Sequence, residues 1–544
     1  MLDFAISKYL LKEDINEQVN YVANNEKMPF IFRQSFIYFY TKLYKEHNYL
    51  FWDHYFKIVQ EESPLFRLLH QTTLIYVLVN CYSSVEDLNI IFQETDIDKK
   101  GQIVKKLLEG IRFLNRGNIR EKDVDLLLKV STCLHVTNVW EVNSLITISI
   151  EQYFLSEQLN VIKSLSDASC NCFDFVWENR KDVNSRDVLD HNGGVKAIDN
   201  IIKTLPFNIE KAQKFFNNIL SLLNEEDFPI GYFYQLSDNI VLIYNHDNEL
   251  ATSIYKSLYF HTERSEKGTN LGNGVVLSLR SNRKQDYGMV HYALEEKFKE
   301  FLKLDFDFAL ALGIDIYNAV NDLTANKLYQ KVNFEIGKSK FEICSDYSRY
   351  DYDSSNGPSS YINKILDEIG QNLNTKNTIR KGIEQLKRLM PLIKHAMVWR
   401  RVFQLLRRSP EKTKLIAFQL LSKREIYLFD ELVYEAGELI TAVWLNLTYL
   451  QKEKIEKIIL SLHLDNPSSI IVSRIIQLIN CIPTGQTTTK AAEEILADNM
   501  KVPNEPMVYE GNILADVSYS SREEKAKWSG FNVDDKDDDV LYKK

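Results

Sequence analysis

Glycine and proline are scarce in this chain. Among 544 residues there are 19 glycines and 11 prolines, so few positions interrupt a helix, because these two residues are the least favourable in a helix interior. Apolar residues recur at three- and four-residue spacing through most of the sequence, which is the spacing of one buried helix face. The sequence therefore predicts stacked helices.

Cysteine is also rare, and the cysteines do not cluster. Thiols spread over a long chain argue against a disulfide framework and favour a reducing compartment, so we expect a cytoplasmic protein. The richest apolar stretch, residues 65–81, is interrupted by Arg67, His70 and Gln71, and we expect neither a signal peptide nor a membrane span. The six cysteines are Cys81, Cys133, Cys170, Cys172, Cys344 and Cys481.

An excess of positive charge is absent as well. The chain has 66 Lys and Arg residues against 75 Asp and Glu residues, a net charge of -9. Because a protein that neutralises phosphates needs a clustered basic surface, this balance argues against nucleic-acid binding over the whole chain, although a local basic stripe is still allowed. Hydrophobic residues make up 45% and charged residues 26%, which is typical of a globular protein with a large core.

Several helix starts can be identified. The pairs Ser63-Pro64, Ser409-Pro410 and Asn466-Pro467 each place a side-chain acceptor at the N-cap and a proline at the first helical position. An apolar stripe follows each pair. After the third pair, the stripe consists of Ile471, Ile475, Leu478 and Ile479, and another stripe consists of Ile103, Val104, Leu107, Leu108, Ile111 and Leu114.

We predict an all-α fold, specifically an α-solenoid of degenerate HEAT-like antiparallel helix pairs. No fixed repeat length is visible, and HEAT repeats of about 40 to 47 residues leave little more than a hydrophobic rhythm. A single closed helical bundle is the alternative, which the chain length disfavours. The predicted regions are N-terminal helical repeats at 1–260, a Gly/Asn-rich loop or hinge at 261–288, C-terminal helical repeats at 289–482 and a polar, partly disordered acidic tail at 483–544. A second irregular insertion is expected at 337–360.

Three short patterns resemble parts of chemical sites but lack the rest. Gly337-Lys338-Ser339 resembles the end of a phosphate loop, yet Val332 stands where its first glycine belongs. His261-Thr262-Glu263 resembles the start of a zinc-deaminase signature, yet the Pro-Cys-x-x-Cys half is missing. The third pattern, Cys170, Cys172 and His191, lacks a second pair at zinc-ligand spacing.

Two pairs of carboxylates are candidate ligands of a divalent cation. Asp305 and Asp307 would point to different faces of a helix, so only Asp351 and Asp353, in a predicted loop, have suitable spacing. Solvated loop acids are the commoner explanation of such a pair. We therefore predict no catalytic residue, no cofactor and no metal ligand.

The densest basic cluster surrounds Trp399. A helix would bring Arg400, Arg407 and Arg408 near one face, beside an aromatic ring that can stack on a base or a guanidinium. Arg401 lies next to them in the sequence. The alternative is a solvated helix edge paired with neighbouring acids. These five residues form the predicted interaction site.

Several segments resemble one known family. The runs LDFAISKYLL at 2–11, FRQSF at 32–36 and FW at 51–52 are similar to the segment that follows the ATPase and winged-helix modules in very large bacterial STAND (NACHT-like) ATPases. Gln34 stands where the family pattern has Pro. The runs ICSDY at 343–347, VWRRVF at 398–403 and ELVYEAG at 431–437 resemble the helical C-terminal half of the same proteins.

The resemblance implies a function without carrying over a catalytic residue. The Walker motifs of that family match nothing in this chain, and the helical stripe begins at Leu2, so we expect the sensor or scaffold half of such a protein, with a segment missing upstream. In this family the helical repeats recognise an invader or stress ligand and release oligomerisation of the ATPase, commonly in antiphage defence.

We therefore expect a non-catalytic protein-recognition scaffold. Its expected partner is a protein, either a phage protein or a separate ATPase subunit, and no membrane is involved. One alternative is a nucleic-acid-processing enzyme or binder whose site is assembled from scattered acidic and basic residues. A purely structural adaptor is the third possibility.

Overall fold

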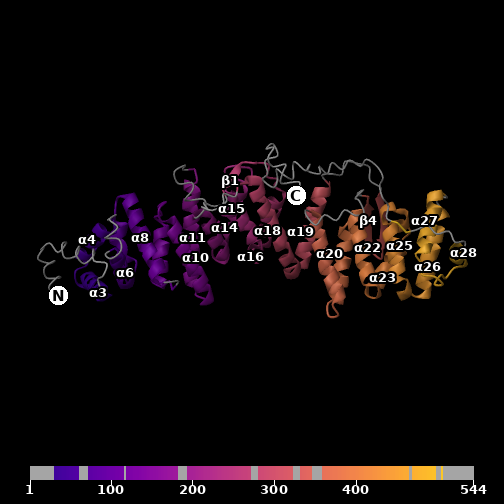
Figure 1. Ribbon diagram of the computed structural model, residues 1–544, viewed down its shortest axis with the longest axis horizontal. Helices are drawn as coiled ribbons and strands as arrows, with labels where there is room; N and C mark the ends of the chain where they lie inside the picture. The colour runs from indigo at the N-terminus through magenta and orange to yellow at the C-terminus, as the bar shows by residue number, and fades with distance from the viewer. Residues whose placement is uncertain are drawn as a thin grey trace, which may run out of the picture. The chain divides into compact units, whose positions relative to one another are not determined.

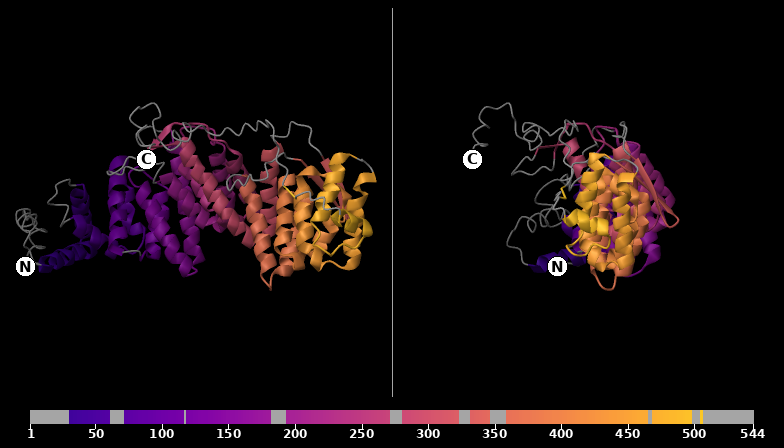
Figure 2. Two further views of the ribbon diagram at one scale, coloured as in Figure 1. Left: turned by 45° about the vertical axis from the view of Figure 1, so that its right-hand side comes forward. Right: turned by 90° about the vertical axis from the view of Figure 1, so that its right-hand side faces the viewer.

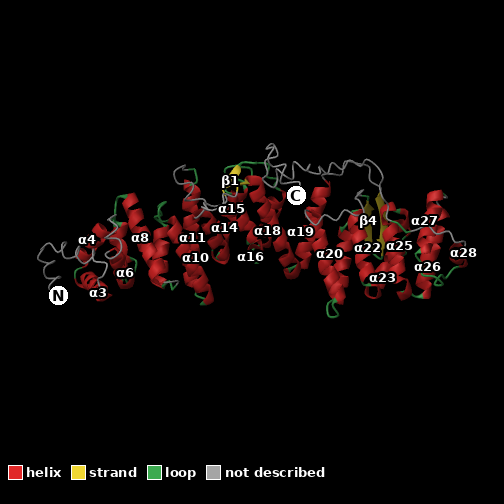
Figure 3. Ribbon diagram, in the orientation of Figure 1, coloured by secondary structure: helices red, strands yellow, loops and turns green. Residues whose placement is uncertain are grey.

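The computed structural model describes residues 30–60, 71–115, 118–181, 193–270, 280–322, 331–345, 358–464, 468–497 and 504–505. The chain divides into two compact units, residues 1–294 (unit 1) and 295–544 (unit 2). Within the described ranges, regular structure is helical except for two short antiparallel hairpins (Figures 1 and 3). The predicted all-α fold is confirmed.

Unit 1 is a stack of helices that pack in sequence order. Helix α10 contacts α9 and α11, and α11 in turn contacts α13. Packing restricted to near neighbours along the chain is characteristic of a solenoid. The helices are α3 (Phe30–Glu46), α4 (Asn48–Val59), α6 (Thr72–Cys81), α7 (Asn89–Phe92), α8 (Ile97–Asn115), α9 (Glu121–Ser131), α10 (Val139–Leu155), α11 (Leu159–Asn179), α13 (Val195–Lys203), α14 (Ile209–Leu220), α15 (Ile230–Asp238), α16 (Ile240–Tyr244), α17 (Asn248–Phe260) and α18 (Arg283–Leu304).

Unit 2 includes the end of α18 and is built in the same way. Helix α20 contacts α19, α21 and α22, while α22 contacts α25 and α25 contacts α27. These helices stand side by side, from orange to yellow in Figure 2. They are α19 (Phe306–Asp322), α20 (Pro358–Asn374), α21 (Ile379–Leu389), α22 (Ala396–Arg408), α23 (Pro410–Leu421), α24 (Arg424–Leu428), α25 (Val433–Val443), α26 (Tyr449–Leu460), α27 (Ser469–Asn480) and α28 (Lys490–Ala497).

The apolar stripes predicted for α8 and α27 face the core. Five stripe residues of α8, from Ile103 to Ile111, and all four of α27 are buried, while the side chain of Leu114 is not described. This burial explains why these segments are helical, since most helix stability in proteins comes from packing an apolar face. Solenoid-like stacking is therefore shown, and the HEAT-like repeat type stays a prediction.

The predicted helix starts differ in their chemistry. Helix α23 does begin at Pro410, but the Ser409 hydroxyl donates to Asn374 Oδ1 at 2.8 Å instead of capping the helix. Helix α27 begins after Ser468, whose hydroxyl accepts from the Ile471 N–H at 3.3 Å. The predicted pairs at 63–64 and 466–467 lie outside the described residues.

The irregular insertion expected at 337–360 is wrong at both ends, because 339–344 form a strand and α20 already begins at Pro358. Strand β3 (Lys331–Ile336) pairs with β4 (Ser339–Cys344), with Phe334 opposite Phe341. Alternating apolar residues here are a strand pattern, and Gly337 makes the tight turn possible because its φ is 63°, where a residue without Cβ is favoured. The segment 343–344, compared above with a helical region, is therefore the end of a strand.

The predicted loop at 261–288 is shorter than expected. A hairpin of β1 (Gly268–Asn270) and β2 (Arg280–Asn282) lies inside it, and α18 already begins at Arg283. Asn282 and Gln285 explain this start. Asn282 Oδ1 accepts from the Gln285 N–H at 2.9 Å, and Gln285 Oε1 accepts from the Asn282 N–H at 3.2 Å, as in a capping box.

Two predictions concern the ends of the sequence. Helix α28 lies within the predicted tail at 483–544, so 490–497 are helical. The acidic run at 534–539 and the predicted stripe that starts at Leu2 lie outside the described residues. Among the helices that the structure describes, none has both the length and the apolar composition needed to cross a bilayer.

Candidate functional site

The predicted cluster on α22 is split between the core and the surface. Trp399 has no exposed surface, and its ring lies edge-on against Phe334 and Phe341, with centroids 5.8 and 6.0 Å away. Arg400 is buried too. The tryptophan therefore anchors the β3–β4 hairpin and is inaccessible to a base, so the predicted five-residue surface does not exist as such.

Arg407 serves helix packing. Its Nη1 donates to Glu438 Oε2 on α25 at 2.9 Å and lies 3.7 Å from Glu435 Oε2. Arg407 is therefore paired with neighbouring acids, as expected of a solvated helix edge. Arg401, which is half-buried, and Arg408, which is exposed, lie at the surface. They are seven residues apart, two helical turns, and so share one face.

Arg401 and Arg408 line a basic pocket of about 530 Å³ between α18, α20 and α22. Four basic side chains and one carboxylate, that of Asp367, contribute to its wall. A pocket of this volume lies within the usual range of ligand sites. The basic side chains are Lys299, Lys364, Arg401 and Arg408.

Both lysines of the basic pocket have carboxylate partners. Lys364 Nζ lies 2.8 Å from Glu295 Oε1, and Lys299 Nζ lies 2.8 Å from Glu296 Oε1. The hydrogen bond from Lys299 keeps the pKa of Glu296 below its usual value. These glutamates offset the charge of the two lysines, and Arg401 and Arg408 add two further positive charges to the wall of the pocket.

Asn363 contributes a different feature to the same pocket. Its Oδ1 atom is buried and accepts no hydrogen bond from the residues that the structure describes. Buried polar atoms are normally hydrogen-bonded, so a ligand N–H or O–H group that reached this oxygen after a turn of the Asn363 side chain would supply the missing hydrogen bond. The pocket therefore combines positive charge with a vacant acceptor, and it suits a ligand that carries both an anion and a donor.

The two lysines and Asn363 were missed by sequence reasoning. Residues 299, 363 and 364 are far from 401 and 408 in the chain. They meet because α20 packs between its neighbours and contacts α22. Helical periodicity places side chains on a face of their own helix and does not say which distant helix shares that face.

The other sequence patterns take structural roles. Gly337 and Lys338 form the turn between β3 and β4. Cys170 and Cys172 are buried in α11, and burial raises the pKa of Cys170 to about 12, which disfavours the thiolate that binds metals. His191 lies outside the described residues.

The three candidate carboxylates that the structure describes are paired or cap a helix. Glu263 Oε2 accepts from Arg283 Nε at 2.7 Å. Asp305 caps α19 by accepting from the Phe308 N–H at 3.0 Å, and Asp307 accepts from Arg388 on α21. Residues 351 and 353 are not described. Over the described part of the chain, no three His, Cys, Asp or Glu side chains are placed to hold a metal ion.

Comparison with known proteins adds no family. The sequence matches no protein-family model, and no curated protein matches it closely.

Proposed function

We propose that this chain is a non-catalytic recognition scaffold whose second unit binds an acidic segment of a partner protein in the basic pocket. One observation carries this proposal. The helices α18, α20 and α22 bring four basic side chains and the vacant acceptor of Asn363 to one concavity of about 530 Å³. Side-chain carboxylates of a polypeptide match the cations, and its backbone N–H groups match Asn363.

A nucleic acid fits the basic pocket less well. Binding a phosphate backbone uses cations spread along a groove, often with aromatic rings on which bases stack. The aromatic ring predicted for this role, Trp399, is fully buried. A phosphodiester group also offers no donor to Asn363. We therefore favour a protein ligand and treat an oligonucleotide as the competing outcome.

Fluorescence anisotropy with a labelled deca-glutamate peptide tests the basic pocket. The double variant Arg401→Glu/Arg408→Glu is expected to raise the Kd of the peptide at least tenfold relative to the unmodified chain, because two attractive charges become repulsive. Raising the salt concentration from 50 to 200 mM is expected to weaken the interaction, since exposed charges are screened over about 10 Å at 0.1 M ionic strength.

A charge-matched control separates the pocket from the overall field. Lys376 and Arg380 are exposed on the same unit, and the variant Lys376→Glu/Arg380→Glu changes the net charge by the same amount. It is expected to leave the Kd within twofold. Equal weakening by both double variants would contradict a specific pocket, and tighter binding of a ten-nucleotide single strand than of the peptide would favour the nucleic-acid alternative.

We further propose that the chain is the sensor half of a STAND-type antiphage defence ATPase and acts in the cytoplasm. The support is the family resemblance, together with six cysteines that are all free. Deleting its coding sequence in the native host is expected to raise plaque formation at least tenfold for at least one phage. Complementation with Arg401→Glu/Arg408→Glu is expected to fail, and unchanged plaque counts after deletion would refute the defence role.

A further inference from the structure

The short segment Asn504–Glu505 is held in a groove between α25 and α27. Asn504 Nδ2 donates to the Tyr434 backbone oxygen at 3.2 Å and to Glu438 Oε1 at 3.1 Å. Asn504 Oδ1 accepts from Gln477 Nε2 at 2.9 Å. The carboxamide thus makes hydrogen bonds to both helices that form the groove.

These partners require an amide at position 504. A backbone carbonyl and a carboxylate only accept hydrogen bonds, so the atoms facing Tyr434 and Glu438 must belong to the NH₂ group of Asn504. An aspartate, which has the same shape, would place an oxygen against both acceptors, and buried donors or acceptors without partners are costly. The groove therefore distinguishes Asn from Asp.

The walls of the groove are suited to close approach. Gly437 lies beneath the carboxamide, and a Cβ atom there would stand 3.0 Å from Asn504 Oδ1 and 2.7 Å from Cys481 Sγ. Glu438 is held in place because its other oxygen pairs with Arg407 at 2.9 Å. Arg407, predicted from sequence as an interaction residue, thus supports this groove through Glu438.

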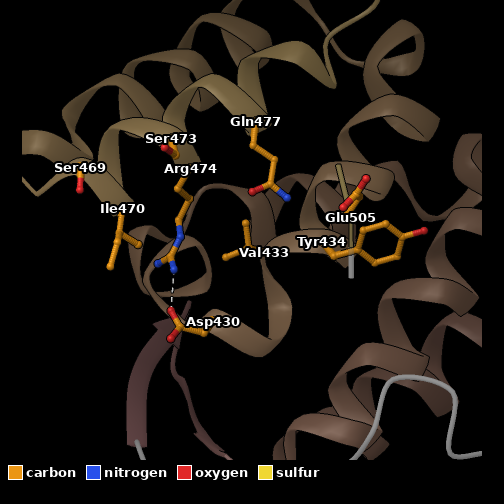
Figure 4. A pocket seen from close by; sticks show the side chains of 9 residues that line it. All are labelled: Asp430, Val433, Tyr434, Ser469, Ile470, Ser473, Arg474, Gln477 and Glu505. Atoms are coloured by element: carbon orange, nitrogen blue, oxygen red, sulfur yellow. Dashed lines mark hydrogen bonds and ion pairs between the residues drawn. The ribbon is translucent and has the colours of Figure 1, made fainter. Parts of the chain in front are cut away.

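A pocket of about 370 Å³ adjoins the segment. Figure 4 shows Arg474 and Gln477 extending from α27 toward Asp430 and Val433, with Glu505 beside Tyr434. Arg474 is fixed by Asp430, 2.5 Å away. The surface around the docked segment is therefore concave and ordered by its own ion pair.

We infer that the groove between α25 and α27 is a docking site for an extended segment that presents an asparagine, and that its occupant is this chain's own Asn504–Glu505. The sequence supports an extended occupant. Prolines stand at 503 and 506, and a residue that precedes proline disfavours the helical conformation. Such restriction lowers the entropy cost of docking. This inference does not rest on the basic pocket.

Binding of the segment as a separate molecule tests the inference. A fluorescein-labelled peptide of residues 499–509 is titrated with the full chain and with its Asn504→Ala variant. In the unmodified chain the attached segment competes at an effective concentration of the order of millimolar. We therefore expect the peptide to bind Asn504→Ala at least tenfold more tightly. A peptide with Asp in place of the asparagine is expected to bind that variant at least tenfold more weakly.

Two controls complete the experiment. Glu494→Gln removes a negative charge from an exposed residue of α28 that does not line the groove, and it is expected to behave like the unmodified chain. Gln477→Glu, combined with Asn504→Ala, replaces the donor to the carboxamide and is expected to weaken peptide binding. Equal affinity of the peptide for the unmodified chain and Asn504→Ala, or equal binding of the Asn and Asp peptides, would overturn the inference.

Discussion

The two hairpins share a topology but are held by different forces. In β3–β4, Phe334 and Phe341 stack at 5.3 Å and both rings contact the buried Trp399. In β1–β2, which has three-residue polar strands, the neighbouring Arg283 donates its backbone N–H to Lys267 O at 2.9 Å. The β3–β4 hairpin is an apolar extension of the core of unit 2, whereas the β1–β2 hairpin depends on polar contacts.

Arg283 is the centre of those polar contacts. Its side chain is 4% exposed, and it donates to the carboxylate of Glu263 and to the backbone oxygens of Glu226 and Phe228. A buried charge is tolerated when it is paired and hydrogen-bonded in this way. The comparison teaches that one hairpin should respond to changes in packing and the other to changes in pH.

The largest expected effect concerns the apolar hairpin. Trp399→Ala should lower the free energy of unfolding of unit 2 by about 4 kcal/mol, because it removes a fully buried ring and leaves a cavity. Lys340→Ala, on the same hairpin and exposed, is the control and should change it by no more than about 0.5 kcal/mol. Urea unfolding, monitored by hydrogen exchange of residues 331–345, measures the change in unfolding free energy for both variants. Similar changes for Trp399→Ala and Lys340→Ala would refute the apolar anchoring of the hairpin.

The polar hairpin should show an intermediate effect. Glu263→Gln keeps the size of the side chain but removes its charge, and it should lower the stability of unit 1 by about 2 kcal/mol, the order of a hydrogen bond to a charged group. Hydrogen exchange of residues 261–270 reports the loss. An unchanged exchange rate would show that Arg283 is held by the backbone carbonyls alone.

The pH dependence of unit 1 sharpens the same comparison. Burial alone raises the pKa of Glu263, but hydrogen bonds from the Ser265 N–H and from Arg283 outweigh it, so the pKa lies below its usual value. Around this pKa the unfolded state therefore binds more protons than the folded state, so ionised Glu263 stabilises the fold. This contribution to the free energy of unfolding is fully present above about pH 4.3, the usual pKa of a glutamate, and it is lost as the pH falls through the lower pKa of the folded state. Acid titration of the unfolding free energy should show this loss, and Glu263→Gln should lack it.

The smallest effect is expected at the surface of the polar hairpin. Lys267 forms an ion pair with Asp227, and both side chains are more than half exposed. Lys267→Ala should therefore cost only about 0.2–1 kcal/mol, decreasing as salt is added. A loss as large as that of Glu263→Gln would mean that the surface pair, and not the buried one, anchors β1–β2.

Helical periodicity made much of the fold predictable. The stripe residues of α8 and α27 and the start of α23 at Pro410 depend on local spacing and local backbone chemistry, and they agree with the structure. The β3–β4 hairpin was also encoded locally, in the alternation around Phe334 and Phe341 and in the turn at Gly337. It was missed because its two strands are short and lie in a long helical sequence.

The candidate site was only partly predictable. The basic residues around Trp399 could be recognised as a cluster, but their roles could not be assigned, because burial of Trp399 and Arg400 depends on packing against residues distant in the chain. The same holds for Arg407, whose partner Glu438 lies on another helix.

By itself, the sequence determined three properties: the protein is helical, several of its buried helix faces can be located, and its charge balance is acidic. These properties depend on composition and on neighbours within one or two helical turns. Only the tertiary structure decided which arginines reach the basic pocket, that Lys299, Asn363 and Lys364 join them, and that Asn504 is held by α25 and α27. The physical reason is that each of these arrangements requires helices far apart in the sequence to pack in one particular register.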